Sequence, residues 1–470
     1  MSSLLEVTPK HVPPLDPGFR PASLGTRAYL AAVKASGQGV PLVLGLRREG
    51  AFSVFKTQVF APGSAHDADT LRYVERTVKF MLWQKGGHTI VVGGAHEIAD
   101  HLRKAYAPGG SRAFDAEFMS RDVYEHAFGV EHTTPDQVPA SQEPAAPKGG
   151  HLDGCRIGLD LGASDRKVAA VIDGKAVYSE EVIWNPKTEK DPEFHYREIR
   201  TALKAAASHM PRVDAIGVSS AGIYINNRAM IASLFRGIPK DLFASRIKPI
   251  FLNIRKEFNN VPLEVCNDGD VTALAGAMNL KSGAVLGVAM GSSEAAGYVT
   301  RESYLTDWLS ELAFAPVDFR TDKPPVDEWS GEAGCGVQYF SQVAAIRLAE
   351  AAGIPLQADA SPAEKLKAIQ ELMPNGHPKI KQVFESIGCF LGYAIAHYAD
   401  FYEIKNLLIL GRVTSGEGGV ILLAKAREVL KDEFPQIAGS LEIHIPEEES
   451  DRRVGQAVAA ASLPSIPKKA

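Results

Sequence analysis

The chain has 470 residues, of which 45% are hydrophobic and 23% are charged, and its formal net charge is −5. This length is too great for one hydrophobic core and suits two or three domains of an ordinary globular protein. The slightly acidic balance excludes the basic surface that nucleic-acid binding needs. No apolar run approaches the roughly 20 residues that span a bilayer.

The four cysteines are scattered and form no CxxC pair, which argues against a disulfide framework and fits a reducing compartment. The first residues lack a basic start followed by an apolar core, so the sequence predicts no secretory signal. We therefore predict a cytoplasmic protein that binds neither membranes nor nucleic acid, and we leave a homo-oligomer open.

We predict an N-terminal α/β domain over residues 1–132, and we expect its first residues, 1–25, to form a loose arm. A hairpin is expected over 40–60, a helix over 68–84 and a buried strand over 88–94. The same order of elements recurs in residues 155–222, with Arg47 where Asp160 stands in the later copy. This block is either a degenerate duplicate without phosphate chemistry or an unrelated α/β unit.

Residues 133–150 are rich in proline and small polar residues and read as a linker. Beyond it, buried strands alternate with amphipathic helices, which favours α/β layers with covered sheets. We predict lobe I over 151–280, lobe II over 281–450, and a C-terminal helix and tail over 451–470. The expected strands cover 155–162, 166–173, 213–220, 283–291 and 405–411, and the expected helices cover 194–210, 364–373, 377–402 and 418–430.

The stretch GLDLGASDRKVAAVID predicts an anion-binding hairpin. A strand reaching Asp160 and followed by Gly162, Ala163 and Ser164 lets backbone N–H groups and a hydroxyl face a phosphate. The Asp160 carboxylate would hold Mg²⁺ through water, since Mg²⁺ prefers a few carboxylates with waters and phosphate oxygens. The alternative is a plain hairpin, because tight turns favour Asp and Gly as well.

A second small-residue turn follows a buried strand at Gly291, Ser292 and Ser293. Its backbone N–H groups would cradle phosphates, unless the small residues serve only close packing. Glu294 comes next, and it either faces the phosphate or turns away. Two like charges about 4 Å apart cost on the order of 4 kcal/mol at an effective dielectric of 20, so an inward Glu294 would weaken phosphate binding at this turn.

Two further segments place polar or glycine residues after strands. Asn267 and Asp268 follow a strand and precede a helix, where a carboxylate is well placed to take a proton from a hydroxyl. Asn and Asp are also the preferred N-cap residues, which is the structural alternative. Gly411 and Gly416 lie in a turn between a strand and a helix that would pass close to an adenine ring.

The order of these elements resembles the ROK family (repressors, open reading frames, kinases), a sugar kinase branch of the actin–hexokinase–Hsp70 superfold. The family's DxGGTK motif matches Asp160 to Lys167, with Asp165 and Arg166 as two extra residues at the hairpin tip. Its NDAN motif matches the segment beginning at Asn267, and its E-x-G-H stretch matches 310–319, keeping Glu311. The resemblance covers about 155–462.

The resemblance implies a two-lobed α/β fold of the actin/hexokinase-like (ribonuclease H-like) kind, here with an additional N-terminal α/β domain. It implies ATP-dependent phosphorylation of a sugar or polyol hydroxyl, with Asp268 as the base and Asp160 holding Mg²⁺ through water. Asn267 and Glu311 would bind the sugar. The ATP-binding set would be Asp160, Gly162, Ala163, Ser164, Lys167, Gly291, Ser292, Ser293, Gly411 and Gly416.

The chain departs from the family at its zinc motif. Phe314 stands in place of the zinc-binding His, and the cysteine motif keeps only Cys335, with Glu328 and Ser330 at the other positions. A structural zinc site needs about four N or S ligands, so we expect no zinc. Val337 also replaces a sugar-contacting Glu. A catalytically inactive ROK-like ligand-binding or regulatory protein is therefore the alternative function. A DNA-binding repressor is disfavoured, because the first block lacks a basic recognition helix.

Overall fold

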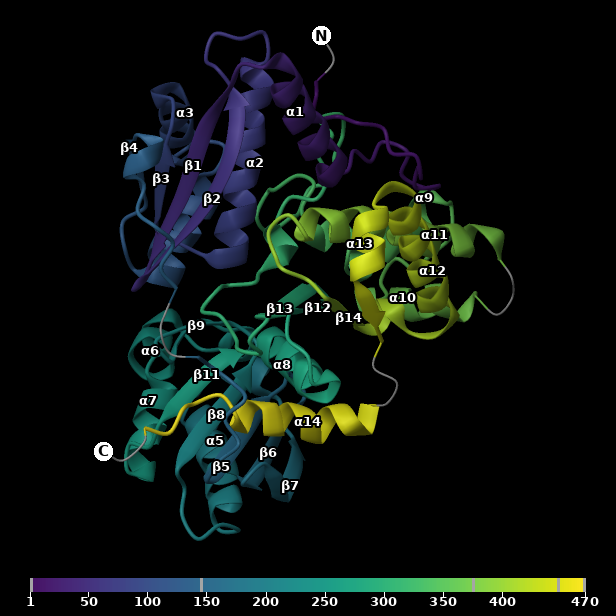
Figure 1. Cartoon of the computed structure of the whole chain (residues 1–470). Coiled ribbons are helices and arrows are strands. Elements are labelled where there is room, and N and C mark those ends of the chain that lie inside the picture. The colour runs from purple at the N-terminus through teal and green to yellow at the C-terminus, as the bar shows by residue number, and fades with distance from the viewer. Residues whose placement is uncertain (1–2, 144–146, 374–376, 446–448, 468–470) are drawn as a thin grey trace.

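The computed structural model describes residues 3–143, 147–373, 377–445 and 449–467. It is a mixed α/β protein whose three larger sheets lie in three parts of the chain (Figure 1). The first block carries a sheet in the order β2-β1-β3-β4. Its elements are α1 (Ala22–Ser36), β1 (Gly39–Arg48), β2 (Ala51–Phe60), α2 (Asp67–Lys85), β3 (Thr89–Gly93), α3 (His96–Tyr106), α4 (Ala113–Glu117), η1 (Phe118–Tyr124), β4 (Gly129–Thr133) and η2 (Pro135–Gln137).

Lobe I contains a five-stranded sheet in the order β11-β8-β5-β6-β7. Strands β5, β8 and β11 are parallel, so their carboxyl ends meet at one edge of the sheet. The elements are β5 (Cys155–Leu161), β6 (Asp165–Ile172), β7 (Lys175–Ile183), η3 (Pro186–Thr188), α5 (Pro192–Ala207), β8 (Ala215–Ser220), β9 (Ile223–Ile225), β10 (Arg228–Ile231), η4 (Ser233–Phe235), α6 (Lys240–Leu242), η5 (Phe243–Ile247), α7 (Ile250–Arg255), η6 (Lys256–Phe258), β11 (Leu263–Asn267) and α8 (Asp268–Leu280).

Lobe II has a sheet in the order β13-β12-β14-β15, again an antiparallel hairpin joined to parallel strands. Its elements are β12 (Val285–Met290), β13 (Glu294–Val299), η7 (Leu312–Phe314), η8 (Gly336–Gln338), α9 (Gln342–Ala351), α10 (Pro362–Glu371), α11 (Pro378–Tyr398), β14 (Asn406–Leu410), η9 (Arg412–Thr414), α12 (Gly416–Glu433), α13 (Pro435–Ser440) and β15 (Glu442–His444). The turns 162–164 and 291–293 are thus the hairpin turns of the two lobes.

The first block does not repeat the topology of lobe I. Strand β3 pairs antiparallel with β1, whereas β8 pairs parallel with β5. The difference arises because lobe I adds a third antiparallel strand, β7, before its helix, so that the chain enters α5 from the opposite end of the sheet. The first block therefore has the expected hairpin on a sheet but a different strand connection, and whether it is a degenerate duplicate or an unrelated α/β unit stays open.

Helix α14 (Glu449–Ala461) returns to lobe I and lies against β5, β6 and β8 (Figure 1). Two glycines permit this close approach. A Cβ on Gly158 would lie 1.8 Å from the carbonyl oxygen of Ala457, and one on Gly217 would lie 1.7 Å from that of Ala460. The helix backbone therefore rests directly on the sheet, on the face opposite the apolar core that α5 helps to form.

The first block and lobe II share one hydrophobic core. Trp83 of α2 is fully buried, and its ring packs 4.5 Å, centroid to centroid, from that of Phe314. Apolar side chains of α1, α2 and β1 belong to the same buried cluster as those of α9, α11 and α12, whereas most of the lobe I core is separate. The two parts are therefore expected to behave as one unit.

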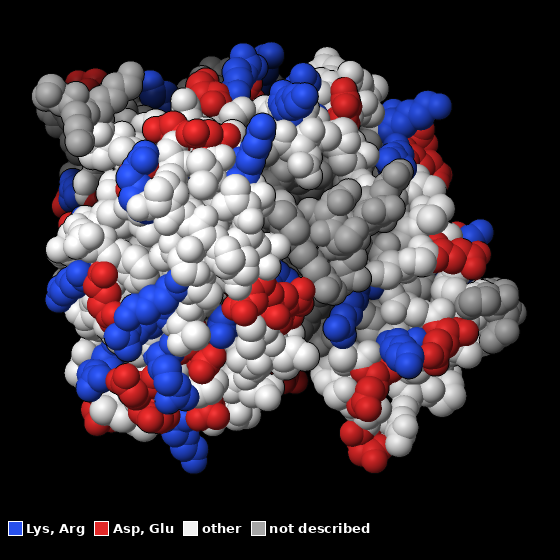
Figure 2. Space-filling model, turned by 90° about the horizontal axis from the view of Figure 1, so that it is seen from below, with Lys and Arg blue, Asp and Glu red and all other residues white. Residues whose placement is uncertain are grey.

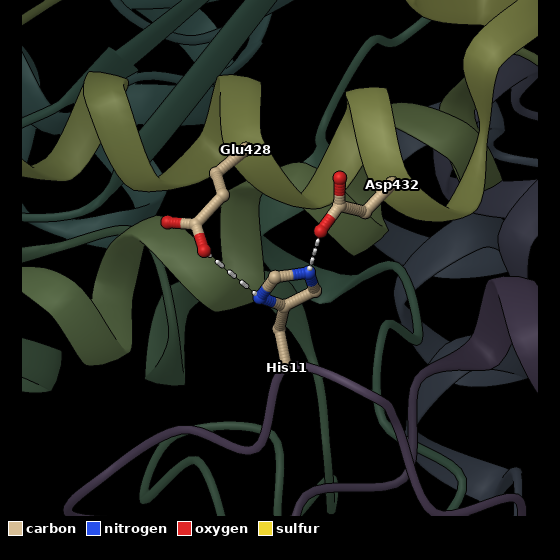
Figure 3. Close-up of side chains that lie close together, drawn as sticks. All are labelled: His11, Glu428 and Asp432. Atoms are coloured by element: carbon tan, nitrogen blue, oxygen red, sulfur yellow. Dashed lines mark hydrogen bonds and ion pairs between the residues drawn. The ribbon is translucent and has the colours of Figure 1, made fainter.

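The N-terminal residues, expected to be a loose arm, are docked on lobe II. Leu5 and Phe19 are buried. The His11 imidazole lies between two carboxylates of α12, with Nε2 3.0 Å from Asp432 and Nδ1 3.5 Å from Glu428 (Figure 3). The Lys425 ammonium lies 3.2 Å from His11 Nδ1, so a positive charge already occupies this cluster, which we interpret as an anchor for the arm.

No helix within the described ranges is long and apolar enough to cross a membrane. On the face seen in Figure 2, basic and acidic side chains are interspersed.

Candidate active site

Asp160 lies near the carboxyl end of β5, in register with Ser219 of β8 and Lys167 of β6. Asp160 is buried, and its side chain is 7% exposed. Its Oδ1 accepts a 2.7 Å hydrogen bond from the Ser219 hydroxyl, and its Oδ2 lies 3.7 Å from the Lys167 ammonium. Burial raises the pKa of Asp160, while Ser219 and Lys167 oppose that rise.

The hairpin turn beside it consists of Gly162, Ala163 and Ser164. The N–H of Gly162 donates to the carbonyl of Asp165 at 2.9 Å, which closes the turn. The motif comparison predicted Asp165 and Arg166 at the hairpin tip. In the structure both residues belong to β6, where Arg166 pairs with Leu161. The strand absorbs the two extra residues, so the tip remains three residues long.

Asn267 and Asp268 stand at the junction of β11 and α8. Asn267 is the N-cap of α8: its Oδ1 accepts from the N–H of Gly269 at 2.7 Å, and its Nδ2 donates to the carbonyl of Gly222 at 2.8 Å. Asn267 is therefore the N-cap residue, while Oδ1 of Asp268 accepts from the same Gly269 N–H at 3.1 Å. Desolvation, followed by the charge of Asp160, raises the pKa of Asp268 to about 6.

Glu311 is positioned by the first block. The backbone N–H groups of Ser310 and Glu311 donate to the carbonyls of Gln84 and Trp83, at 2.8 and 2.9 Å. These carbonyls belong to the last turn of α2, where backbone carbonyls have no N–H donor within the helix. Burial, followed by the charge of Asp268, raises the pKa of Glu311 to about 7. Asp160, Asp268 and Glu311 thus form one electrostatically coupled group.

The second turn, Gly291, Ser292 and Ser293, joins β12 to β13. The carbonyl of Gly291 accepts from the N–H of Gln342 at 2.9 Å, which brings the amino end of α9 to this turn. A helix amino end carries partial positive charge and favours anions.

Glu294 turns away from the second turn and into lobe II. Its side chain is 3% exposed, and its Oε1 accepts a 3.2 Å hydrogen bond from the Tyr398 hydroxyl. Its Oε2 lies 2.0 Å from where a Cβ on Gly336 would stand. Burial raises the pKa of Glu294 to about 8. The side chain is therefore largely uncharged at pH 7, and of the two orientations that the sequence left open it has the one turned away from the second turn.

Gly411 and Gly416 lie beyond the carboxyl end of β14, beside the end of β12. Gly411 has a φ of 97°, and a Cβ there would stand 2.3 Å from the carbonyl oxygen of Met290. Gly416, with a φ of 66°, is the first residue of α12 and has open space around it. The positive φ values explain why glycine occurs at both positions.

The structure adds residues that sequence reasoning missed. Asp270 is buried in the first turn of α8, its Oδ1 accepts from the N–H of Tyr298 at 3.3 Å, and burial raises its pKa. Lys148, assigned to the linker, pairs with Glu264 at 3.4 Å and lies near Asp270. Ser219 could have been found as the polar end of a buried strand. Lys148 carried no comparable signal.

The residues at the positions of the family's zinc motif make apolar contacts instead. Phe314, Cys335 and Val337 pack together in one small apolar cluster. Nearby, Glu332 forms buried ion pairs with Arg76 and Arg112 of the first block. These contacts tie the first block to lobe II where the family would hold its zinc, and the absence of zinc from this protein stays a prediction.

Comparison with solved structures identifies the architecture. The ROK hexokinase from Thermus thermophilus is 18% identical, with a TM-score of 0.51, and the match covers 65% of this chain and 97% of that one. A ROK family glucokinase from Streptomyces griseus, solved with glucose and AMPPNP, is 20% identical with a TM-score of 0.44, covering 65% and 98%. A ROK family transcriptional regulator, a homolog of the E. coli MLC protein, is 16% identical with a TM-score of 0.49, covering 66% and 78%.

No protein-family model and no curated protein sequence matches the chain. The likeness to the Thermus hexokinase therefore bears on the fold, and there it confirms the resemblance to the ROK family seen in the motifs. The chain has the two-lobed α/β fold of the actin/hexokinase-like ROK proteins, with a further α/β block before it.

Proposed function

We propose that the protein transfers a phosphoryl group from ATP to a hydroxyl of a sugar or sugar-like polyol. The observation that carries the proposal is the environment of Asp268. This carboxyl stands at the start of α8, next to the N-cap residue Asn267. Desolvation and the charge of Asp160 raise its pKa to about 6, although its hydrogen bond from the Gly269 N–H, at 3.1 Å, opposes that rise. A base whose pKa lies just below the working pH is mostly ionised yet still accepts a proton readily.

In the proposed mechanism, Asp268 takes the proton of the attacking hydroxyl as the bond to phosphorus forms. Asn267 and Glu311 would hold the sugar on either side of that base. Asn267 retains one amide hydrogen beyond its bond to Gly222. Glu311, with its pKa raised to about 7, is half protonated at neutral pH and so presents both a donor and an acceptor to sugar hydroxyls.

The residues present fit Mg²⁺ and ATP. Oδ2 of Asp160 has its charged neighbour Lys167 at 3.7 Å, beyond hydrogen-bond distance, which leaves this oxygen able to accept from a metal-bound water. The turns 162–164 and 291–293 would hold phosphates through backbone N–H groups, with Lys167 nearby, and Gly411 and Gly416 would flank the adenosine. When bound, Mg²⁺ supplies neutralisation of the charge on the transferred phosphoryl group.

A catalytically inactive ligand-binding protein is the alternative. Two departures favoured it in the sequence: the apolar residues Phe314 and Val337, and the acid Glu294. Glu294 is buried in lobe II beside Tyr398 rather than at the phosphate turn, so only the first departure still favours the alternative.

The deciding experiment measures ADP release with Mg·ATP across a panel of hexoses, amino sugars and polyols. It compares the natural chain with Asp268→Asn, and with Asp359→Asn as a surface control. We expect sugar-dependent turnover that falls by at least about a hundredfold in Asp268→Asn and is unchanged in the control. Absence of turnover with every sugar, together with no thermal shift from Mg·ATP, would refute the kinase and leave a repurposed binding fold.

A further inference from the structure

A pocket of about 660 Å³ lies between the first block and lobe I, apart from the candidate active site. Arg121 and Asp122 of η1 form its first-block side, and residues from 230 to 248 form its lobe I side. We call it the boundary pocket. None of the residues proposed to bind ATP, Mg²⁺ or sugar lines it. Sites for small molecules commonly measure roughly 300–1,000 Å³, so the boundary pocket is large enough to hold one.

The floor of the boundary pocket is apolar and lies where two hydrophobic cores meet. Ile231 and Phe243 both line the pocket and are half-buried, so a ligand can reach them. Ile231 packs against the core that the first block shares with lobe II, whereas Phe243 packs against the lobe I core. Met230 and Ile238, which also line the pocket, are buried behind them. Because covering apolar surface is favourable, this floor suits a ligand with an apolar body.

The rim of the boundary pocket is basic. Arg236 and Lys240 line it and are exposed, and neither forms an ion pair with another residue that the structure describes. Among the described lining residues Asp122 alone is acidic, and its carboxylate is already paired with Arg121 at 2.8 Å. Two positive charges at the rim therefore lack an acidic partner, and an anionic group on the ligand would supply one.

The boundary pocket adjoins the ion pairs that join the first block to lobe I. Glu125, directly after η1, pairs with Lys248 at 2.6 Å and with Arg228 at 2.9 Å. Lys248 also lines the pocket. A ligand that contacts both η1 and the lobe I side would therefore connect the same two parts of the chain as these ion pairs do.

We propose that the boundary pocket binds a small organic anion, whose apolar body covers Ile231 and Phe243 and whose phosphate or carboxylate group pairs with Arg236 and Lys240. The first block then forms one wall of a ligand site of its own. The inference goes beyond the proposed function, because binding at this pocket requires neither ATP nor a sugar.

The test measures Kd by calorimetry on the full chain, without ATP, for 1-naphthyl phosphate, 1-naphthoate and the neutral 1-naphthalenemethanol. We expect both anions to bind more tightly than the alcohol, and the tighter anion identifies the acidic group. The double variant Arg236→Gln/Lys240→Gln should weaken both anions roughly three- to tenfold and leave the alcohol unchanged. The control is Lys175→Gln/Lys190→Gln, which removes two exposed positive charges of lobe I outside the pocket and should change neither anion.

Two further variants test the place and the first-block wall. Ala244→Trp puts a large side chain at an exposed lining position and should weaken all three probes, whereas Ala176→Trp, on the exposed face of β7, should not. Asp122→Asn removes the acidic charge of the first-block wall and should tighten both anions roughly two- to fivefold.

The proposed phosphate turns 162–164 and 291–293 could also bind 1-naphthyl phosphate, so the variants decide where the probe lies. Binding that persists unchanged in Ala244→Trp and in the double variant would overturn the inference, and so would an absence of binding by both anions. Unchanged anion affinities in Asp122→Asn would overturn the part played by the first block. Sugar-dependent turnover enters none of these measurements, so the boundary pocket and the kinase are tested separately.

Discussion

The Ser219 hydroxyl donates a 2.7 Å hydrogen bond to Oδ1 of Asp160 across two parallel strands of lobe I. This bond stabilises the ionised form of a carboxyl whose burial favours the protonated form, since burial raises the pKa of Asp160 and Ser219 lowers it. The charge that would attract a hydrated metal ion therefore depends on a neighbour that touches no ligand itself.

Ser219→Ala should raise the Mg²⁺ concentration needed for half-maximal turnover by roughly three- to tenfold, because the Asp160 carboxylate loses a hydrogen bond to its charged form. The effect should grow as the pH is lowered from 8 to 6, because Ser219 favours the ionised form of a carboxyl whose pKa burial raises. Turnover titrated with Mg²⁺ at both values measures it. Ser220→Ala is the matched control, since the Ser220 hydroxyl accepts from Tyr224 instead. Equal Mg²⁺ requirements in all three proteins would contradict the role of Ser219.

The pH dependence of kcat should follow Asp268. Because a base must be deprotonated to act, kcat should fall about tenfold per pH unit below pH 6 and level off above pH 7, as the pKa of about 6 requires. Glu311→Gln removes the neighbouring carboxyl and should keep this acid limb at saturating sugar while changing KM. A rate independent of pH between 5 and 7 would show that another group takes the proton.

Glu294→Gln should make the stability less dependent on pH. The folded state raises the pKa of Glu294 from 4.5 to about 8, so its protonated carboxyl stabilises the fold fully below pH 4.5, and this contribution is lost as the pH rises towards 8. At pH 7 the loss is on the order of 3 kcal/mol. Urea unfolding of both proteins from pH 5 to 8 measures it, with the exposed Glu371→Gln as control. Parallel curves for the natural chain and Glu294→Gln would contradict the buried, protonated state.

Trp83→Ala should lower the free energy of unfolding by about 3–5 kcal/mol, because it empties a fully buried site in the core that joins the first block to lobe II. Trp329→Ala is the contrast: this ring also packs on Phe314 but is 57% exposed, so its loss should cost less than about 1 kcal/mol. Urea unfolding monitored by circular dichroism measures both. The first block and lobe II should unfold in one transition, and a separate early transition of the first block would argue against the shared core.

Local features of the site could be predicted from the sequence because their partners lie close along the chain. The apolar runs on either side of Asp160, Gly162 and the polar turn predicted the hairpin, and a strand followed by Asn267 and Asp268 predicted a helix start. Of the two alternatives for that start, cap or base, the cap is Asn267, and the role of Asp268 as a base stays a prediction.

Features made by distant segments could not be predicted. Helix α2 positions Glu311 by hydrogen bonds from backbone N–H groups to backbone carbonyls, and no pattern of side chains in the sequence indicates such bonds. Strand β7 was missed because it is an edge strand with most of its side chains exposed or half-exposed, so its apolar periodicity is weak. The N-terminal arm was read as loose because its buried residues, Leu5 and Phe19, stand singly among prolines and polar residues.

The docking of the two outer segments of the chain on different lobes has a practical consequence. The N-terminal arm is fixed to α12 of lobe II through His11, while the carbonyls of Leu463 and Pro464 are fixed to Gly149 and Arg156 beside lobe I. A fluorescent dye attached near the exposed residue Val12 would therefore move with lobe II, and one near the exposed residue Ser465 would move with lobe I. Energy transfer between them would follow the lobes directly as sugar and nucleotide are added, without a label near the site.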